Sequence, residues 1–279
     1  MKVLILADGH GTQPNEHDSV VPKPLVEIGG RPILWHVMRL YSHYGLNEFV
    51  ICGGSNGSSI KNYFLNYMPY PRHFTLDLQS NSIAFHRSES EPWKVTLLET
   101  GQTTMTAERL KDYIAGSTFC LTYGESLSDV NIRELIRFHR QQGALATVTA
   151  VQEPGRFAAI NLSSERPRAA RLLEKDVRGR PVINGGFFVL EPESLDVVEG
   201  DSTSWETDLL ARLIQQDQLA VYRHHGYLQK MDTLRDQEAL QKEWDSGKPP
   251  WCVWNSEHAN LPKDLSRGAQ PLMTAEARI

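Results

Sequence analysis

A short loop near the start of the chain combines residue types that bind anions with residue types that transfer protons. The apolar run MKVLIL is followed by Asp8, Gly9, His10, Gly11 and Thr12. Glycines let backbone N–H groups approach a phosphate closely, and a threonine hydroxyl can add a further donor. An aspartate and a histidine beside a phosphate could instead serve as acid and base. The loop therefore predicts a phosphate site, with altered acid–base chemistry at Asp8 and His10 as the alternative.

Lys23 is the second candidate for phosphate binding, because it stands between Pro22 and Pro24. Prolines fix the backbone and remove N–H donors, so the lysine ammonium is offered from a stiff segment. A solvated lysine in a proline-rich loop is the alternative. The nearby glycines do not match a dinucleotide fingerprint, because Pro14 stands where the third glycine belongs. A P-loop is excluded too, since Gly-Lys-Ser/Thr is missing from this loop.

The elements around these residues predict a parallel α/β frame. Continuous apolar runs at 2–7 and 49–54 are typical of strands buried on both faces, and helical patterns follow at 32–45 and 58–68. This order implies a parallel sheet with right-handed crossovers. Such sheets bind ligands beyond the carboxyl ends of their strands, which is where the loop after residue 7 would lie.

The same alternation continues along the chain. Further strands are expected at 74–79, 82–87, 93–100, 119–124, 144–151, 157–162, 170–175, 182–190 and 219–224. Further helices are expected at 107–116, 131–143, 204–216 and 234–247. Asn131 with Glu134 resembles a capping box. Polar composition after residue 254 predicts one domain, 1–254, and a C-terminal tail, 255–279.

Bulk composition narrows the class of protein. The 279 residues are 40% hydrophobic and carry a net charge of −5, so the chain has no basic footprint for nucleic acid. No apolar run approaches the ~20 residues that span a bilayer. Cys52, Cys120 and Cys252 have no paired spacing, which predicts reduced thiols rather than a disulfide frame or zinc site. We expect a cytoplasmic protein that binds neither nucleic acid nor membrane.

Several segments taken together resemble the sugar-1-phosphate nucleotidyltransferases. They are Gly-x-Gly-Thr at 9–12, VPKPLVEIGGRPILWHVMRLYSHYG at 21–45, EPWKVTLLETG at 91–101, LTYGE at 121–125, INGGFFVLEP at 183–192, MDTLRD at 231–236 and W-x-x-GKPPW at 244–251. The resemblance implies an α/β, Rossmann-like nucleotidyltransferase fold, with a mostly parallel central sheet flanked by helices and a smaller added β region. It also implies an enzyme that joins a nucleoside triphosphate to a sugar 1-phosphate and releases pyrophosphate.

The resemblance carries roles for individual side chains. The matched catalytic residues are Lys23, Glu125 and Asp232, of which the two carboxylates match ligands of Mg²⁺ or Mn²⁺. The matched nucleotide-binding residues are Gly9, Gly11, Thr12 and Arg109. The matched sugar-phosphate residues are Glu174, Lys175, Asn184 and Gly185. The chemistry agrees, because lysines suit phosphates, amides and carboxylates suit hydroxyls, and carboxylates suit Mg²⁺.

Members that transfer a cytidylyl group resemble this chain most, so CTP and a hexose 1-phosphate are the expected substrates and a CDP-sugar the expected product. Members of the family are commonly oligomeric, which predicts a homo-oligomer.

The nucleotide side departs from the family pattern. An arginine of the glycine-rich loop is Gln13 here, a loop glycine is Asp8, and the aspartate of Tyr-Gly-Asp-Gly is Glu125. One unit charge about 6 Å from another is worth roughly 2–3 kcal/mol at an effective dielectric near 20. Two changed charges therefore oppose a triphosphate by several kcal/mol. Two hypotheses follow: a nucleotidyltransferase that tolerates the changes, or a divergent relative that keeps a sugar-phosphate site and has lost or changed the family activity.

Overall fold

Strand β1 (Val3–Leu6) lies in the middle of a large sheet, as its uninterrupted apolar sequence predicts. The computed structural model describes residues 1–7, 21–67, 73–80, 82–86, 91–98, 107–114, 116–152, 159–162, 169–173, 182–197 and 209–254. Within them β1 pairs in parallel with β4 (Glu48–Cys52) and β8 (Phe119–Tyr123). β7 (Lys94–Leu98) continues the parallel sheet beyond β4.

On the other side of β8 the sheet continues with β13 (Val182–Leu190), which lies antiparallel to β8. The other strands of this part are β10 (Ala146–Gln152), β14 (Leu219–His224), β11 (Ala159–Leu162) and β12 (Ala169–Leu173). The pairings make seven of the nine strands run in one direction, and only β12 and β13 run in the other. This confirms the prediction of a mostly parallel central sheet with a smaller added β region.

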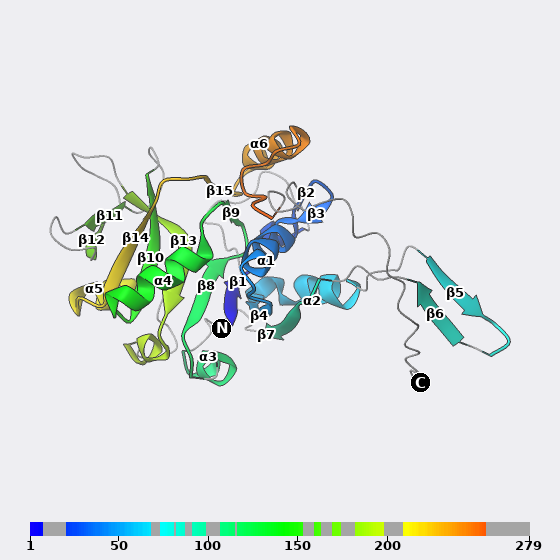
Figure 1. Cartoon of the computed structure of the whole chain (residues 1–279), viewed down its shortest axis with the longest axis horizontal. Helices are drawn as coiled ribbons and strands as arrows, with labels where there is room; N and C mark the ends of the chain where they lie inside the picture. Colours follow the sequence, from blue (N-terminus) through cyan, green and yellow to red (C-terminus); the bar gives the residue numbers. More distant parts are fainter. Residues whose placement is uncertain are drawn as a thin grey trace, which may run out of the picture.

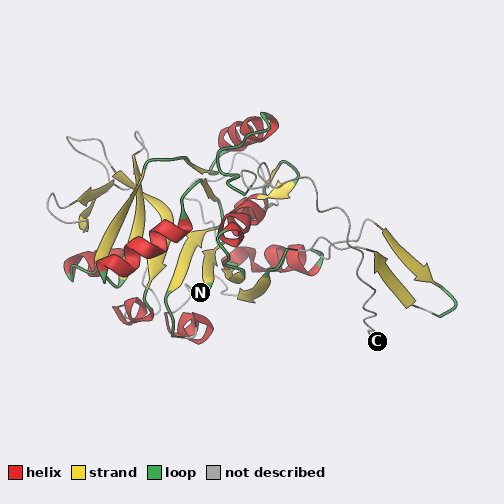
Figure 2. Ribbon diagram, in the orientation of Figure 1, coloured by secondary structure: helices red, strands yellow, loops and turns green. Residues whose placement is uncertain are grey.

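Helices cover both faces of this sheet (Figures 1 and 2). Along β1, Val3 and Ile5 join one hydrophobic cluster, while Leu4 joins the other. The first cluster includes side chains of α1 (Ile33–His43), α2 (Gly57–Leu65), α4 (Ile132–Gln142) and α6 (Leu234–Asp245). The second includes side chains of α3 (Ala107–Ile114) and α5 (Leu210–Gln215). Because both faces are covered, the central strands need apolar residues at every position.

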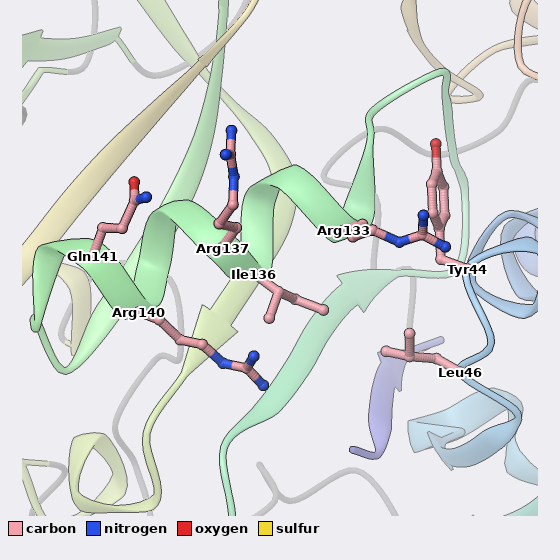
Figure 3. A pocket seen from close by; sticks show the side chains of 7 residues that line it. All are labelled: Tyr44, Leu46, Arg133, Ile136, Arg137, Arg140 and Gln141. Atoms are coloured by element: carbon pink, nitrogen blue, oxygen red, sulfur yellow. The ribbon is translucent and has the colours of Figure 1, made fainter.

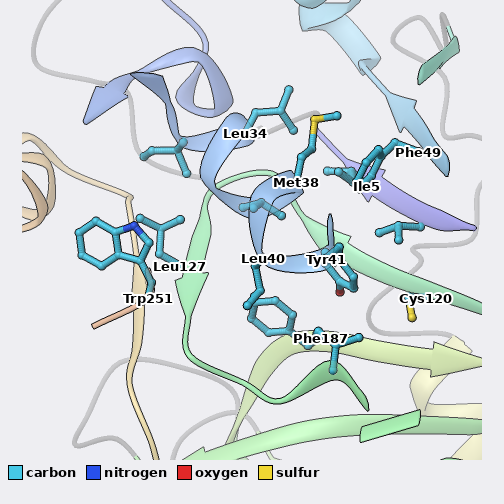
Figure 4. Close-up of a cluster of buried hydrophobic side chains, with 14 of the residues drawn as sticks. Ile5, Leu34, Met38, Leu40, Tyr41, Phe49, Cys120, Leu127, Phe187 and Trp251 are labelled. Atoms are coloured by element: carbon cyan, nitrogen blue, oxygen red, sulfur yellow. The ribbon is translucent and has the colours of Figure 1, made fainter. Parts of the chain in front are cut away.

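The first cluster ties the two ends of the described chain together (Figure 4). Met38 and Tyr41 of α1 pack with Ile5 and with Phe49, and Trp251 joins the same cluster from beyond α6. All three cysteines are free and buried, and burial raises the pKa of each thiol to about 12. The expected burial of Cys52 and Cys120 is therefore confirmed, and Cys252 is buried as well.

Short elements complete the description. They are η1 (Lys23–Leu25), η2 (Gly54–Asn56), η3 (Pro192–Val197), and the antiparallel pairs β2 (Glu27–Ile28) with β3 (Arg31–Pro32), β5 (His73–Asp77) with β6 (Ser82–His86), and β9 (Ser126–Ser128) with β15 (Leu228–Lys230). The β5–β6 hairpin, which the sequence predicted, points away from the sheet in Figure 1.

Two local expectations need correction. The strand expected at 49–54 ends at Cys52, because the chain turns into η2 at Gly54. Asn131 caps α4 by accepting a hydrogen bond from the backbone N–H of Glu134. The Glu134 carboxylate does not close the expected capping box but pairs with Arg137 one turn later.

In the described part of the chain, no helix is long and apolar enough to cross a membrane. The expected tail at 255–279 lies outside the described residues.

His36 on α1 is a buried imidazole in a ring of tryptophans. Its Nε2 lies 2.9 Å from the carbonyl oxygen of Ile28, and the indole N–H of Trp251 donates to its Nδ1 at 3.4 Å. Trp244 and Trp254 also pack against the ring. Burial lowers the pKa of His36 from 6.5 to about 4, so the imidazole is neutral in the folded protein.

We therefore predict that acid destabilises this protein through His36. Between pH 6.5 and about pH 4, His36 is protonated in the unfolded chain but neutral in the folded chain. The free energy of unfolding therefore decreases as the pH is lowered through this range. The loss amounts to about 3 kcal/mol in total, since each unit of pKa difference is worth about 1.4 kcal/mol. Urea unfolding at a series of pH values measures it. His36→Gln should flatten this slope, and the exposed control His225→Asn should leave it unchanged. An equal slope in both variants would contradict the assignment.

Candidate functional site

The carboxyl ends of β1 and β8 meet the segment that carries Lys23. The backbone N–H of Gly124, directly after β8, donates to the carbonyl of Leu6 at 2.9 Å. A Cβ on Gly124 would lie 3.2 Å from Pro24 and 3.5 Å from Ala7. Glycine at 124 therefore allows the prolines beside Lys23 to rest on the end of β8. Ala7 leads directly into the predicted phosphate loop, so Lys23 lies at the edge where that loop begins.

Lys23 forms an ion pair with Asp232. The Nζ atom lies 2.9 Å from Oδ1, although the two residues are 209 positions apart. The lysine side chain is 14% exposed and the aspartate side chain 43%, so the pair faces solvent from the aspartate side. The structure thus brings together two residues that the sequence proposed separately, one for phosphate and one for metal.

Local hydrogen bonds hold Asp232 in place. Asp236 accepts from the backbone N–H of Asp232 at 3.1 Å and from that of Thr233 at 2.9 Å, while the Thr233 hydroxyl caps α6 in return. This is the reciprocal capping box that starts α6, and it also fixes the backbone of the residue before it. The pattern Thr-x-x-Asp in MDTLRD could have predicted it, but the sequence analysis did not use it.

Glu125 lies beside Asp232 in the fold. β9 and β15 pair antiparallel with Ser126 opposite Lys230, and the N–H of Met231 donates to the carbonyl of Glu125 at 3.0 Å. The backbones of the two predicted metal carboxylates are therefore held near each other, at the same end of the β9–β15 ladder. Two carboxylates are the hard oxygen donors that Mg²⁺ binds, usually together with substrate phosphates and water. Among the described residues, no group of three or more His, Cys, Asp or Glu side chains gathers to hold a metal.

The predicted sugar loop lies against the same edge. The Oδ1 atom of Asn184 accepts from the N–H of Gly186 at 2.8 Å, and Asn184 pairs with Ala150 of β10. A Cβ on Gly185 would lie 3.0 Å from the carbonyl oxygen of Thr149. Gly186 has φ +80°, and a Cβ there would lie 2.8 Å from the Tyr123 ring. Asn184, Gly185 and Gly186 lie within β13 rather than in the expected loop, and this part of the strand packs against Tyr123, which ends β8 just before Gly124 and Glu125.

The described residues cover only part of the predicted site. Lys23, Glu125, Asp232, Asn184 and Gly185 lie at one edge of the sheet, as described above. Arg109 lies within α3, but its side chain is outside the description. The other predicted residues lie outside the described part of the chain, namely Asp8, Gly9, His10, Gly11, Thr12, Glu174 and Lys175.

A polar network at the far end of the β9–β15 ladder was missed by the sequence analysis. Asp129 accepts from the backbone N–H of Tyr227 at 2.7 Å and from Nε2 of His224 at 2.8 Å. The hydroxyl of Ser128 donates to the carbonyl of Tyr227 at 2.7 Å. A Cβ on Gly226 would lie 2.3 Å from the Asp129 carboxylate, so the turn needs glycine there. The network closes the ladder on the side opposite Glu125.

Comparisons with known proteins agree with this architecture. The family model described as nucleotidyl transferase matches residues 2–245, and the chain belongs to this family. This confirms the prediction of a nucleotidyltransferase enzyme from the residues of its signature segments.

The chain is also similar to individual proteins of known name. The chain is 43% identical over 258 residues to glucose-1-phosphate cytidylyltransferase of Salmonella typhi, covering 91% of this chain and 100% of the relative. It is 40% identical, with the same coverage, to the probable glucose-1-phosphate cytidylyltransferase of Bacillus subtilis. The fold is also similar to UDP-glucose pyrophosphorylase from Acinetobacter baumanii, with a TM-score of 0.68 at 16% identity, covering 92% of this chain and 98% of that one.

We predict that Gly186→Ala destabilises the protein more than Gly143→Ala. Both glycines have positive φ, +80° and +57°, so both variants lose about 1 kcal/mol to backbone strain. Only at Gly186 does the new methyl group also meet a side chain, which adds about 1–3 kcal/mol for overpacking against Tyr123. Urea unfolding of the two variants measures the difference. Equal losses of unfolding free energy in the two variants would mean that β13 does not pack on Tyr123 at Gly186.

Proposed function

We propose that this chain transfers the cytidylyl group of CTP to a hexose 1-phosphate, forming a CDP-sugar and pyrophosphate. The observation that carries the proposal is the Lys23–Asp232 pair beside Glu125, at the edge that also holds Asn184 and Gly185. Identity of 40–43% to cytidylyltransferases named for glucose 1-phosphate supports the choice of base and sugar. It also favours an active enzyme over a divergent relative that has lost the family activity.

The reaction is an in-line displacement at phosphorus. An oxygen of the sugar phosphate attacks the α-phosphorus of CTP, and a new P–O bond forms while the bond from that phosphorus to the bridging oxygen of the β-phosphate breaks. Pyrophosphate leaves with the electron pair of that bond. No covalent bond to the protein is needed, so the protein contributes position and charge.

Lys23 supplies positive charge where the phosphates meet. An ammonium group has three N–H donors, so Lys23 can hold Asp232 with one of them and donate to phosphate oxygens with the others. The flanking prolines and the packing of Pro24 on Gly124 limit how far the lysine backbone can move. The lysine therefore meets the transition state with little reorganisation, which is where fixed charges are most effective.

Glu125 and Asp232 fit a divalent cation of the Mg²⁺ or Mn²⁺ type. The donor set is right, because both are carboxylates and they flank the paired strands β9 and β15 at the same end of the ladder. A bound cation would neutralise charge on the phosphates as they react. The longer side chain of Glu125, compared with an aspartate, lets its carboxylate reach further from β8. Asp236 and Lys23 keep Asp232 oriented for that role.

The remaining roles are proposed on the resemblance. The side-chain oxygen of Asn184 accepts a hydrogen bond from the N–H of Gly186, so the side-chain NH₂ group is left to donate to a sugar hydroxyl. Glu174 is assigned to a sugar hydroxyl and Lys175 to the phosphate of the sugar 1-phosphate. Gly9, Gly11, Thr12 and Arg109 are assigned to the triphosphate. Asp8 and His10 would serve as acid–base groups only in the alternative, a divergent relative with a changed reaction. A homo-oligomer in the cytoplasm is also proposed, and a monomeric mass by light scattering would overturn the oligomer.

We expect pyrophosphate release with CTP and glucose 1-phosphate in the presence of Mg²⁺ or Mn²⁺. Lys23→Ala should lower kcat/KM by roughly 10²–10³-fold, as loss of a group that stabilises transition-state charge does. The matched control is Lys242→Ala, which removes an exposed lysine from the last turn of α6 and should leave the rate unchanged. No release across a panel of nucleoside triphosphates and sugar 1-phosphates, with sugar-phosphate binding retained in calorimetry, would establish the divergent relative instead.

Asp232→Asn should raise the concentration of Mg²⁺ needed for half-maximal rate by at least about tenfold, because a neutral amide replaces a charged ligand. The control is Asp245→Asn, which keeps the acceptor oxygen for Gln241 at the end of α6. The rate is measured as a function of Mg²⁺ concentration at saturating substrates. An unchanged Mg²⁺ dependence would remove Asp232 from the metal site.

A further inference from the structure

A hollow of about 460 Å³ lies between α4 and the turn that follows α1 (Figure 3). Leu46 and Ile136 give it an apolar base, and Tyr44 stands at its side. The turn with Tyr44 and Leu46 leads into the amino end of β4, whereas Lys23 and Asp232 lie beyond the carboxyl ends of β1 and β8. The hollow is therefore separate from the proposed catalytic site.

Three arginines on α4 line this hollow, at positions 133, 137 and 140. Residues three and four apart are neighbours on a helix surface, so the three positive charges repel one another. Arg133 also lies in the first turn of α4, where the helix dipole disfavours a cation. Arg133 is thus unfavourably placed in a way that a bound anion would relieve, whereas Arg140, in the last turn of α4, is favoured by the dipole.

Two of the three arginines are available to a ligand. Arg137 also lines the hollow, but its guanidinium pairs with Glu134 and is directed away from Ile136 and Leu46 in Figure 3. Arg133 and Arg140 reach toward the space beside Ile136 and Leu46. Among the residues that the structure describes, neither of these two has a carboxylate partner. Arg133 and Arg140 are seven positions apart, which is about 10 Å along the helix axis. Their guanidinium groups can therefore contact an anion from two sides.

We propose that this hollow binds a small organic phosphate with a flat apolar portion. Guanidinium groups bind phosphate oxygens in pairs, which suits Arg133 and Arg140. The apolar portion would cover Leu46 and Ile136 and lie against the Tyr44 ring. The volume falls within the range of about 300–1,000 Å³ that small-ligand sites occupy.

The position of this site gives its ligand a route to the catalytic edge. α1 follows the segment of Lys23, and α4 follows β9, which begins next to Glu125. A ligand held between α4 and the end of α1 contacts the two helices that succeed the catalytic residues in the chain.

The test uses 1-naphthyl phosphate as the probe and calorimetry of the full chain as the measurement. The wild-type protein should bind it, and the double variant Arg133→Gln/Arg140→Gln should bind at least about tenfold more weakly, because charged hydrogen bonds are lost. Arg137→Gln is the matched control and should stay within about threefold of wild type. Lys23→Ala should also stay within about threefold, which separates this site from the catalytic one.

Hydrogen exchange on the same samples should show protection of residues 44–46 and 133–141 by the probe in the wild type and not in the double variant. The free energy of unfolding of the double variant should equal or exceed that of the wild type, because repulsion between arginines on α4 is removed. Absence of binding to wild type, equal binding by the double variant, or binding that requires Lys23 would each overturn the proposal. None of these outcomes depends on turnover, so the proposal and the proposed function fail or stand separately.

Discussion

The short antiparallel ladder between β9 and β15 is the contact on which the candidate site depends. Three residue pairs join strands that lie about 100 positions apart in the sequence, and they place the start of β9 next to the end of β15. Glu125 precedes β9, and Asp232 follows β15 after one residue. Because the strands are antiparallel, these two carboxylates come to the same end of the ladder, where Lys23 completes the cluster. The described residues that we propose for metal, phosphate and sugar all lie at this end.

A ladder of three pairs is marginal by itself, so polar contacts at both ends secure it. Asp236 holds the backbone around Asp232 at one end, and Asp129 holds the turn before β15 at the other. Ser128, His224 and Asp129 have the residue types of a hydrolytic triad, but both contacts of the imidazole involve the same atom, Nε2. A proton relay needs both ring nitrogens. The Asp129 network is therefore structural, and its role is to position β15.

Much of the frame could be predicted from sequence, because β1, β4 and β8 are apolar runs buried on both faces and the helices between them are strongly periodic. The strands β9 and β15 could not, since Ser-Leu-Ser and Leu-Gln-Lys are too short and too polar to show a period. Lys23 and Asp232 were found as separate candidates, but nothing local relates positions 209 apart in the chain. Their roles came from resemblance to a family, and their contact came from the topology of the sheet. The Arg133–Arg140 face could not be recognised either, because a charged helix surface looks the same with or without a hollow beside it.

The distance along the chain between Lys23 and Asp232 also has a consequence for biosynthesis. As the chain leaves the ribosome, β1, β4 and β7 can pair while β15 and α6 are still unmade, so the parallel frame exists before the second carboxylate does. The hydrophobic cluster that packs on β1 is likewise completed by Leu240, Trp251 and Trp254, which are synthesised last. Completion of the core and completion of the charged cluster therefore coincide. A nascent or prematurely terminated chain carries Lys23 and Glu125 but not Asp232, so only a packed chain that extends through α6 holds all three residues that we propose for the phosphates and the metal.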